Sequence, residues 1–552
     1  MVGTRATKDG SMYLARNVDS YDAISSQDLA YHPSRRTPYV YKPADSNFTY
    51  TIPAPSLAYY GFPTNYFPLP MAPTWEELGH NQLGVVVSAT ETISSKVKVQ
   101  TIDPLVPDGI GENSIPSVLL PHPESTSARR TVKLYGRIIE TKGASEENGV
   151  LIADKDEQWQ VGRALYVENA GGHHWLAVRI PEHAVFVSAN QGRIQEVDLR
   201  DTANVMCSPK LLEWAQQNGL WSPAKGRFNW LRDVMMDIPA FRTANYPRVR
   251  VLQSRLNGLP PGQGTANAPT FLPPNRRLDL LDLFGAMRDH YDGSSKDVYL
   301  RNITSVGDLT GKPGEPWRPI AYVGTGFGHV TRIRAEQPAG LRIIHYAFEG
   351  VPAWMPAIPV YASLPPNALP LELNQVGAEV DEDGYPLVNN AKLFWRGRRL
   401  LASLALMLRN WPLFGRRVES AVRSFDARID ADRIAMERQY RQALAMAGRR
   451  GGSGQAAADA ILVAFTCKTV AEAMALVDRL TAEIAKKLGL TAMPTDEQLL
   501  AELQRFYEMY YYDYQTPTPA NPTGAAAATT ASPASATGLV YRPRRRGPGH
   551  RA

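Results

Sequence analysis

Three polar residues near the N-terminus, Arg16, Asn17 and Asp19, are the first candidates for chemistry in this chain of 552 residues. They follow a β-like run that begins at Met12, so we expect them at the end of a strand. A guanidinium and a carboxylate placed there can hold a nucleophile and its proton acceptor in register. The same two groups can form an ordinary ion pair at a strand end, and their types alone leave both interpretations open.

Three further candidates stand at the ends of other predicted strands. Thr90 and Glu91 follow the run at 84–89, and Asn190 follows the run at 184–189. A carboxylate can meet the ammonium group of a substrate, and an amide N–H can stabilise developing negative charge without titrating. Each of the three is also a common residue at a strand end or turn, so this structural alternative stays open.

Several other chemistries lack the residues that they need. Two cysteines, Cys207 and Cys467, give neither a disulfide framework nor a metal-ligand cluster. His173 and His174 are adjacent in a predicted strand and therefore point to opposite faces, and no further ligands follow at a useful spacing. The chain has no Gly-x-Ser-x-Gly nucleophile motif. We therefore predict no metal site and no cofactor.

The opening of the chain, Val2-Gly3-x-x-Ala6-Thr7-x-Asp9-Gly10-Ser11-x-x-x-Ala15-Arg16-Asn17-x-Asp19-Ser20, resembles the PepD-type dipeptidases, a family of N-terminal-nucleophile (Ntn) cysteine peptidases related to penicillin V acylase and bile-salt hydrolase. Further likeness lies in Gly171-Gly172-His173-His174-Trp175, in Val187-Ser188-Ala189-Asn190-Gln191-Gly192-Arg193 and in Met287-Arg288-Asp289-His290-Tyr291-Asp292-Gly293. The resembling blocks keep their order from Val2 to about residue 445.

This resemblance implies an amide hydrolase whose N-terminal cysteine supplies both the thiol and, through its free amino group, the base. It also implies roles for five of the candidate residues and the nature of the substrate. Arg16 and Asp19 would orient the nucleophile, Asn190 would donate to the oxyanion, and Thr90 and Glu91 would bind a dipeptide. The turn of the first hairpin would be Asp9-Gly10.

The chain departs from the family at the nucleophile itself. Judged by the spacing to Arg16, the family's cysteine falls about four residues before Met1. Either the start has been placed too far downstream, which could also hide a signal peptide, or the protein is an inactive relative that acts as a binding or scaffold protein. We expect the misplaced start, because Arg16, Asp19 and Asn190 have little reason to persist together in an inactive protein.

Residues 1 to about 200 alternate short β-rich runs with turn signals, whereas helices enter from residue 208 onward. The segment 31–75 is rich in proline and tyrosine and is predicted to be an ordered surface excursion. The predicted strands are Met12–Ala15, Gly84–Ala89, Thr131–Ile139, Ala164–Glu168, His174–Ile180 and Ala184–Ala189, with the last two placed side by side through a short turn at Glu182 and His183.

Later segments complete an α+β fold class. Helices are predicted at Lys210–Gln217 and Leu278–Tyr291, and further helices at about 389–410, 415–447 and 455–488. By resemblance the body is a four-layer α/β/β/α sandwich. We predict one peptidase domain over 1–514, which includes the helical part from about 389, and a disordered Pro/Ala/Thr-rich linker with an Arg-rich tail over 515–552.

The net charge of +6 arises mainly from this tail, since five arginines lie in the last eleven residues. Weak contact with a polyanion through the tail is one interpretation and a solvated tail is the other. No membrane span is expected, because the longest apolar run, at about 400–408, is only about half the necessary length. The expected partner is a small peptide, and a homo-oligomer is compatible with the sequence. The chain as written would be cytoplasmic, or secreted if a signal peptide precedes it.

Overall fold

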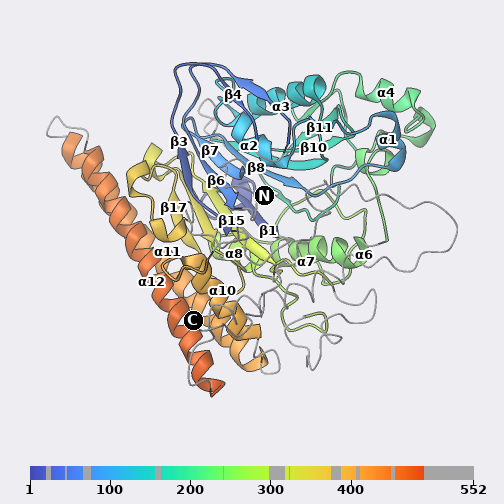
Figure 1. The fold of residues 1–552 in the computed structure, drawn as a ribbon. Coiled ribbons are helices and arrows are strands. Elements are labelled where there is room, and N and C mark those ends of the chain that lie inside the picture. The colour runs from blue at the N-terminus through green and yellow to red at the C-terminus, as the bar shows by residue number, and fades with distance from the viewer. Residues whose placement is uncertain are drawn as a thin grey trace, which may run out of the picture.

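The computed structural model describes residues 1–19, 26–43, 46–65, 76–155, 163–239, 241–297, 317–322, 324–374, 387–405, 411–448 and 454–489. Two larger antiparallel sheets, two separate strand pairs and several helices make a mixed α+β fold in this part of the chain (Figure 1). The predicted Arg-rich tail at 515–552 lies outside the described residues. The α+β class that the sequence predicts is therefore confirmed, with antiparallel pairing in both sheets.

The smaller sheet holds the N-terminal candidates. Its strand order is β1 (Met12–Asp19), β15 (Thr325–Ile333), β16 (Ile343–Phe348) and β17 (Ile358–Tyr361). Gly10 takes a φ of +73°, which glycine adopts at little cost, and Val2 then pairs with Tyr13. The predicted turn at Asp9-Gly10 is thus present, and it sends residues 1–2 back along β1.

The larger sheet has nine strands. Along its main path the order is β13 (Val205–Cys207), β11 (His174–Arg179), β10 (Arg163–Ala170), β9 (Asn148–Asp154), β8 (Val86–Glu91), β7 (Glu76–Asn81), β6 (Tyr59–Asn65) and β2 (Ser26–Gln27), and β3 (Ala30–His32) also pairs with β6. The prediction that 31–75 is only a surface excursion was wrong, because β6 extends the sheet beyond β7 and β4 (Tyr39–Tyr41) pairs with β5 (Tyr50–Ile52).

Helix α3 (Ala128–Lys142) corrects the strand predicted at Thr131–Ile139. Its buried residues Val132, Tyr135 and Ile139 recur at helical spacing, whereas the β-branched residues among them had suggested a strand. Ser127 caps its N-terminus, and α3 packs on β9, β10 and β11. The contact is close, because a Cβ at Gly136 would lie 2.2 Å from the Trp175 ring.

The remaining elements are mostly helical. They are α1 (Val97–Ile102), α2 (Ile115–Leu119), α4 (Leu211–Gln217), α5 (Trp230–Asp233), α6 (Phe241–Ala244), α7 (Tyr246–Asn257), α8 (Leu280–Met287), α10 (Leu393–Ala405), α11 (Trp411–Gly448), α12 (Gln455–Lys487) and the strand pair β12 (Val185–Phe186) and β14 (Phe271–Leu272). The three C-terminal helices match the predicted positions. The strand predicted at 184–189 does not pair with β11, since β12 pairs instead with β14 and with residues 1–2.

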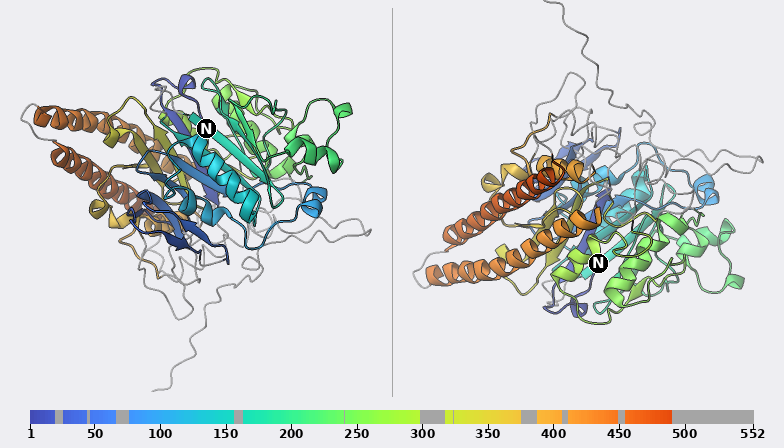
Figure 2. Two further views of the ribbon diagram at one scale, coloured as in Figure 1. Left: turned by 90° about the horizontal axis from the view of Figure 1, so that it is seen from above. Right: turned by 90° about the horizontal axis from the view of Figure 1, so that it is seen from below.

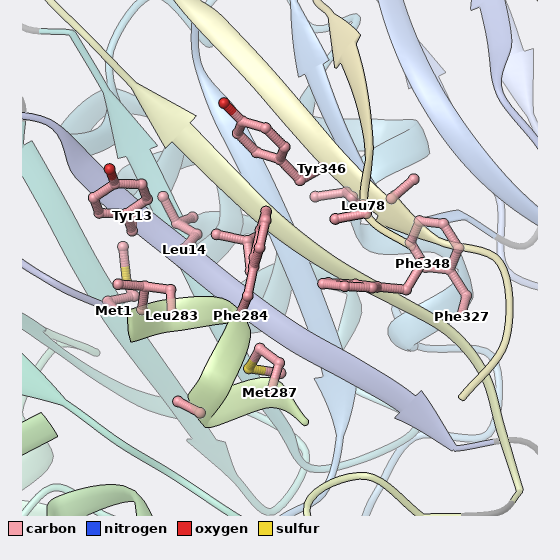
Figure 3. Close-up of a cluster of buried hydrophobic side chains, with 14 of the residues drawn as sticks. Met1, Tyr13, Leu14, Leu78, Leu283, Phe284, Met287, Phe327, Tyr346 and Phe348 are labelled. Carbon is pink, nitrogen blue, oxygen red and sulfur yellow. The ribbon is translucent and has the colours of Figure 1, made fainter. Parts of the chain in front are cut away.

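Helix α8 packs on the small sheet from the side away from the large one. A capping box of Asp279 and Asp282 starts the helix, and Phe284 contacts Tyr346 and Phe348 of β16 with ring centroids 5.3 and 5.5 Å apart. Figure 3 shows Phe284 rising from α8 toward these two rings. Helices α11 and α12 are the longest in the described part of the chain. They run side by side at the edge of the molecule (Figure 2), and α12 packs on β17.

Helix α12 contains an 18-residue window with a mean hydropathy of 1.8, long and apolar enough to cross a membrane by length and composition alone. The search of the sequence for apolar runs had pointed to about 400–408 and did not identify this helix. Half of the window is buried against the rest of the protein, as in a core helix, so the segment is weak evidence for a membrane span.

A chain of buried polar side chains joins the two sheets. It runs through Ser88, His329, Thr331, His345 and His80 to the carbonyl oxygen of Ala362, with successive distances of 3.3, 3.0, 2.8, 2.9 and 3.2 Å. A carbonyl can only accept, so each neutral histidine donates toward Ala362 and accepts from the other side. One direction of donation thus satisfies every member only while the three histidines are uncharged.

This requirement predicts acid sensitivity. Burial lowers the pKa of His80 to about 4 and holds the pKa values of His329 and His345 well below the usual range. Stability should be full above the unfolded-state pKa of about 6.5 and fall as the pH drops toward 4, with a loss of about 3 kcal/mol from His80 alone. Urea denaturation at pH 7.5, 6 and 5 measures this loss. A free energy of unfolding that stays constant over this range would contradict it.

Candidate active site

Arg16 points from β1 into the space between the two sheets. Its guanidinium pairs with Glu77 of β7, lies 3.3 Å from the Glu112 carboxylate and donates to the carbonyl oxygen of Ala89 on β8. The Arg16 side chain is only 10% exposed, so these ionic contacts are shielded from water. The structure therefore places Arg16 next to the end of β8, where Thr90 and Glu91 follow Ala89.

The carboxylates around Arg16 outnumber the positive charge. Burial raises the pKa of Glu77, which Arg16 offsets only in part, and burial together with the charge of Glu77 raises that of Glu112 well above its usual range. Glu91 lies at the exposed rim, and its partial enclosure together with Glu146 raises its pKa to about 7. These carboxyl groups therefore tend to hold protons, and a positive charge placed among them would favour their ionised forms.

Asp19 leaves β1 in a different direction from Arg16. Its carboxylate accepts from Arg318 Nη2 at 2.5 Å and from Thr325 Oγ1 at 2.7 Å. The Tyr291 hydroxyl donates to the carbonyl oxygen of Arg318 at 2.8 Å. Arg16 and Asp19 thus have separate partners. They do not form the simple ion pair with each other that the sequence also allowed.

Tyr291 belongs to the Met287–Gly293 motif, which is fixed by a buried imidazolium. His290 bonds to Asp297 at 2.9 Å and to Glu419 of α11 at 2.7 Å. Burial opposes the charge, but these carboxylates outweigh it and raise the pKa of His290 to about 10. Tyr291 itself has a φ of +66°, an uncommon conformation for a non-glycine residue, so the turn is tightly specified.

Asn190 lies half-buried on the loop that follows β12, held from the opposite side by α7 and the residue before it. Arg248 Nη2 donates to Asn190 Oδ1 at 2.8 Å and to Asn245 Oδ1 at 2.6 Å, while Asn245 Nδ2 donates to the Asn190 carbonyl. Because the Asn190 side-chain oxygen accepts from Arg248, its Nδ2 group is left as the donor that faces away. An oxyanion donor needs this orientation.

Sequence reasoning named Arg16, Asp19 and Asn190 as candidates but did not name the partners Glu77, Glu112 and Arg248 that the structure shows. Glu77 lies in a buried strand whose sequence, Glu-Glu-Leu-Gly-His-Asn, is too polar for a core strand, and this was a usable signal. Arg248 gave none, because an arginine on a short helix is ordinarily exposed. In the described residues no group of three or more His, Cys, Asp or Glu is arranged to hold a metal ion.

The family model "Peptidase family C69" matches residues 1–421, and the chain belongs to that family. It is accordingly a hydrolase of peptide bonds. The chain is 36% identical over 373 residues to a probable dipeptidase of Salmonella dublin, with 66% of this chain and 80% of the relative covered. A probable dipeptidase of Latilactobacillus sakei is 30% identical over 367 residues (66% and 73% covered), and a dipeptidase of Bifidobacterium longum is 28% identical over 430 residues (73% and 76% covered).

The contact from Arg248 leads to a test of the Asn190 orientation. Arg248→Lys keeps the charge but cannot bond to both Asn190 and Asn245 through one planar group, so kcat for peptide-bond hydrolysis should fall about 10-fold or more with little change in KM. Steady-state kinetics measure both constants. Arg250→Lys is the matched control, since Arg250 lies on the same helix and, among the residues that the structure describes, donates to the carbonyl oxygen of Pro260 at 2.7 Å and not to Asn190. Equal effects of the two changes would contradict the assignment.

Proposed function

We propose that the protein hydrolyses dipeptides through an N-terminal cysteine that lies four residues before Met1, on a chain whose true start is upstream. The observation that carries this proposal is the pairing of the first residues. Val2 pairs with Tyr13 on one side and with Val185 on the other, and Met1 exchanges two backbone hydrogen bonds with Phe186. The chain therefore enters between β1 and the segment that leads to Asn190.

If the pairing with Tyr13 continues backward from Val2, the fourth residue before Met1 would lie opposite Val18 of β1, on the side of the loop after β12 that carries Asn190. Residues directly opposite each other in such a pair have Cβ atoms about 5 Å apart and point to the same face. That face of β1 also carries Arg16, two residues from Val18. A cysteine at this position would thus lie between the Arg16 cluster and the amide of Asn190.

The surroundings of Met1 fit an extended strand. The Met1 ammonium is buried and donates to the Phe186 carbonyl at 2.7 Å, and burial lowers its pKa to about 5. A peptide N–H would make the same bond without an ionisable group that burial forces to lose its charge, so a preceding residue suits this place better. Within the described residues, the edge of β1 that faces away from β15 is paired only at Tyr13.

In the proposed reaction the cysteine thiolate attacks the peptide carbonyl carbon, and Asn190 Nδ2 donates to the oxyanion of the tetrahedral intermediate. The C–N bond breaks as the leaving amine takes the proton that the thiol gave to the α-amino group. Water then attacks the thioester, which releases the acid and restores the thiol. Arg16 and Asp19, which lie on either side of Val18 in β1, act as the groups that orient the nucleophile.

The arrangement of layers supports assignment to the N-terminal-nucleophile fold. Helices α2 and α3 pack on one face of the large sheet, the small sheet faces the other, and α8 covers the small sheet on its outer side. We propose that these contacts are the four-layer α/β/β/α sandwich of that fold class.

The start site is tested directly on protein from its native host. N-terminal sequencing should find a cysteine upstream of Met1, and this protein should cleave dipeptides, whereas its Cys→Ala variant should lose measurable hydrolysis. A chain that starts at Met1 and leaves dipeptides intact would instead identify an inactive relative, used for binding or as a scaffold. In that case a salt-sensitive association lost on removal of residues 540–552 would assign the tail as its binding element.

We further propose that Glu91, with Thr90 beside it, binds the α-ammonium group of the dipeptide. Glu91→Gln should raise KM for free dipeptides about 5- to 10-fold and leave kcat near the wild-type value, because a rim ion pair is lost. For wild type, KM should rise as the pH falls below about 7, where the carboxylate takes up a proton. Kinetics with free and N-acetylated dipeptides measure the effect. An equal preference of both proteins for the free amine would contradict this role.

A further inference from the structure

The loop that carries Asn190 is anchored at its C-terminal end by Glu168, a fully buried residue of β10. Glu168 Oε1 accepts from the backbone N–H of Arg193 at 2.5 Å and from that of Ile194 at 3.4 Å. Its other oxygen accepts from the indole N–H of Trp230 at 2.9 Å. One carboxylate thus connects the large sheet, the end of the Asn190 loop and helix α5.

With the Tyr166 hydroxyl, which also bonds to this carboxylate, four donors converge on Glu168, and this requires a side chain that only accepts. An amide of the same shape would turn an N–H₂ group either toward the two backbone N–H groups or toward the indole N–H, so one donor would lose its partner. The packing leaves little freedom for adjustment. A Cβ added at Gly192 would lie 2.8 Å from Met235 Cγ and 3.4 Å from Glu168 Oε2.

Arg193 closes the base of the same loop. Its buried guanidinium donates to the carbonyl oxygens of Val187, Ala268 and Pro269 at 3.0, 3.1 and 2.8 Å. The bond to Val187 joins the two ends of the segment that contains Asn190. Burial raises the pKa of Glu168 to about 7 and lowers that of Arg193 to about 10. The hydrogen bonds that Glu168 accepts partly offset its shift, and the charge of Glu168 partly offsets that of Arg193.

We propose that Glu168 is a positioning residue for peptide-bond hydrolysis, which fixes the backbone at 193–194 and thereby the place of the Asn190 amide. This inference rests on the proposed function, in which Asn190 donates to the oxyanion. Glu168 does not touch the substrate. It acts through the loop from one end, while Arg248 orients the Asn190 side chain from the other.

The test compares Glu168→Gln with a matched control, Asp154→Asn, at pH 8, where the Glu168 carboxylate of wild type is ionised. Asp154 is also a buried carboxylate and accepts from two backbone N–H groups, those of Ala128 at 2.6 Å and Arg163 at 3.3 Å, at the opposite end of the β9–β10 pair. Both changes should lower the melting temperature. Only Glu168→Gln should speed hydrogen–deuterium exchange in residues 187–194 and lower kcat about 10-fold or more, with KM within about 2-fold.

Unchanged exchange in 187–194, or equal losses of kcat in the two variants, would overturn the inference. Glu168→Asp keeps the charge and provides a second variant, expected between wild type and Glu168→Gln in kcat. If both Glu168 variants fail to fold while Asp154→Asn folds, the residue serves general stability and the inference is wrong. A wild-type protein without hydrolytic activity counts against the proposed function instead, and the exchange comparison still decides whether Glu168 holds the loop.

Discussion

The Arg16 guanidinium lies between the two sheets, where it faces the buried carboxyl groups of Glu77 on the large sheet and of Glu112 in a short 3-10 helix. Without it, Glu77 and Glu112 could ionise only at a high cost in this region of low dielectric constant. Because Arg16 also bonds to the backbone of β8, the separation of the sheets and the position of β1 depend on the same side chain. The polar groups around Arg16 therefore belong to the candidate active site and also connect the two sheets.

A second principle is that the candidate groups are fixed by partners distant in sequence. Asp19 depends on Arg318, whose carbonyl is held by Tyr291 in a turn fixed by His290 and Glu419. Asn190 depends on α7 from one direction and on β10 from the other. Such support suits a site in which small displacements of an oxyanion donor are costly. It also explains why substitutions far from the reacting atoms are expected to alter the rate.

The sequence was informative where local rules decide the structure. The Asp9-Gly10 turn, the helix caps and the three C-terminal helices all follow from turn chemistry and apolar periodicity. It failed where tertiary contacts decide the structure. Strand β12 was expected to lie beside β11, but it pairs instead with β14 and with residues 1–2. The error at Thr131–Ile139 has another cause, because β-branched residues occupied a helical pattern. Within the candidate site, single residues were predictable from motif likeness, but Glu77, Glu112 and Arg248 were not, since only folding brings them near.

The ion pairs of Glu437 concern the boundary of the homologous region. The match to the family model ends at residue 421, inside α11, yet this helix continues to Gly448. Glu437 lies beyond the boundary, and although burial opposes its charge, Arg334, Arg433 and Tyr361 together lower its pKa to about 2. Two of these partners come from the small sheet and the loop after β15. The side chains that pack and pair in this part of the core therefore extend beyond the region that matches the family model.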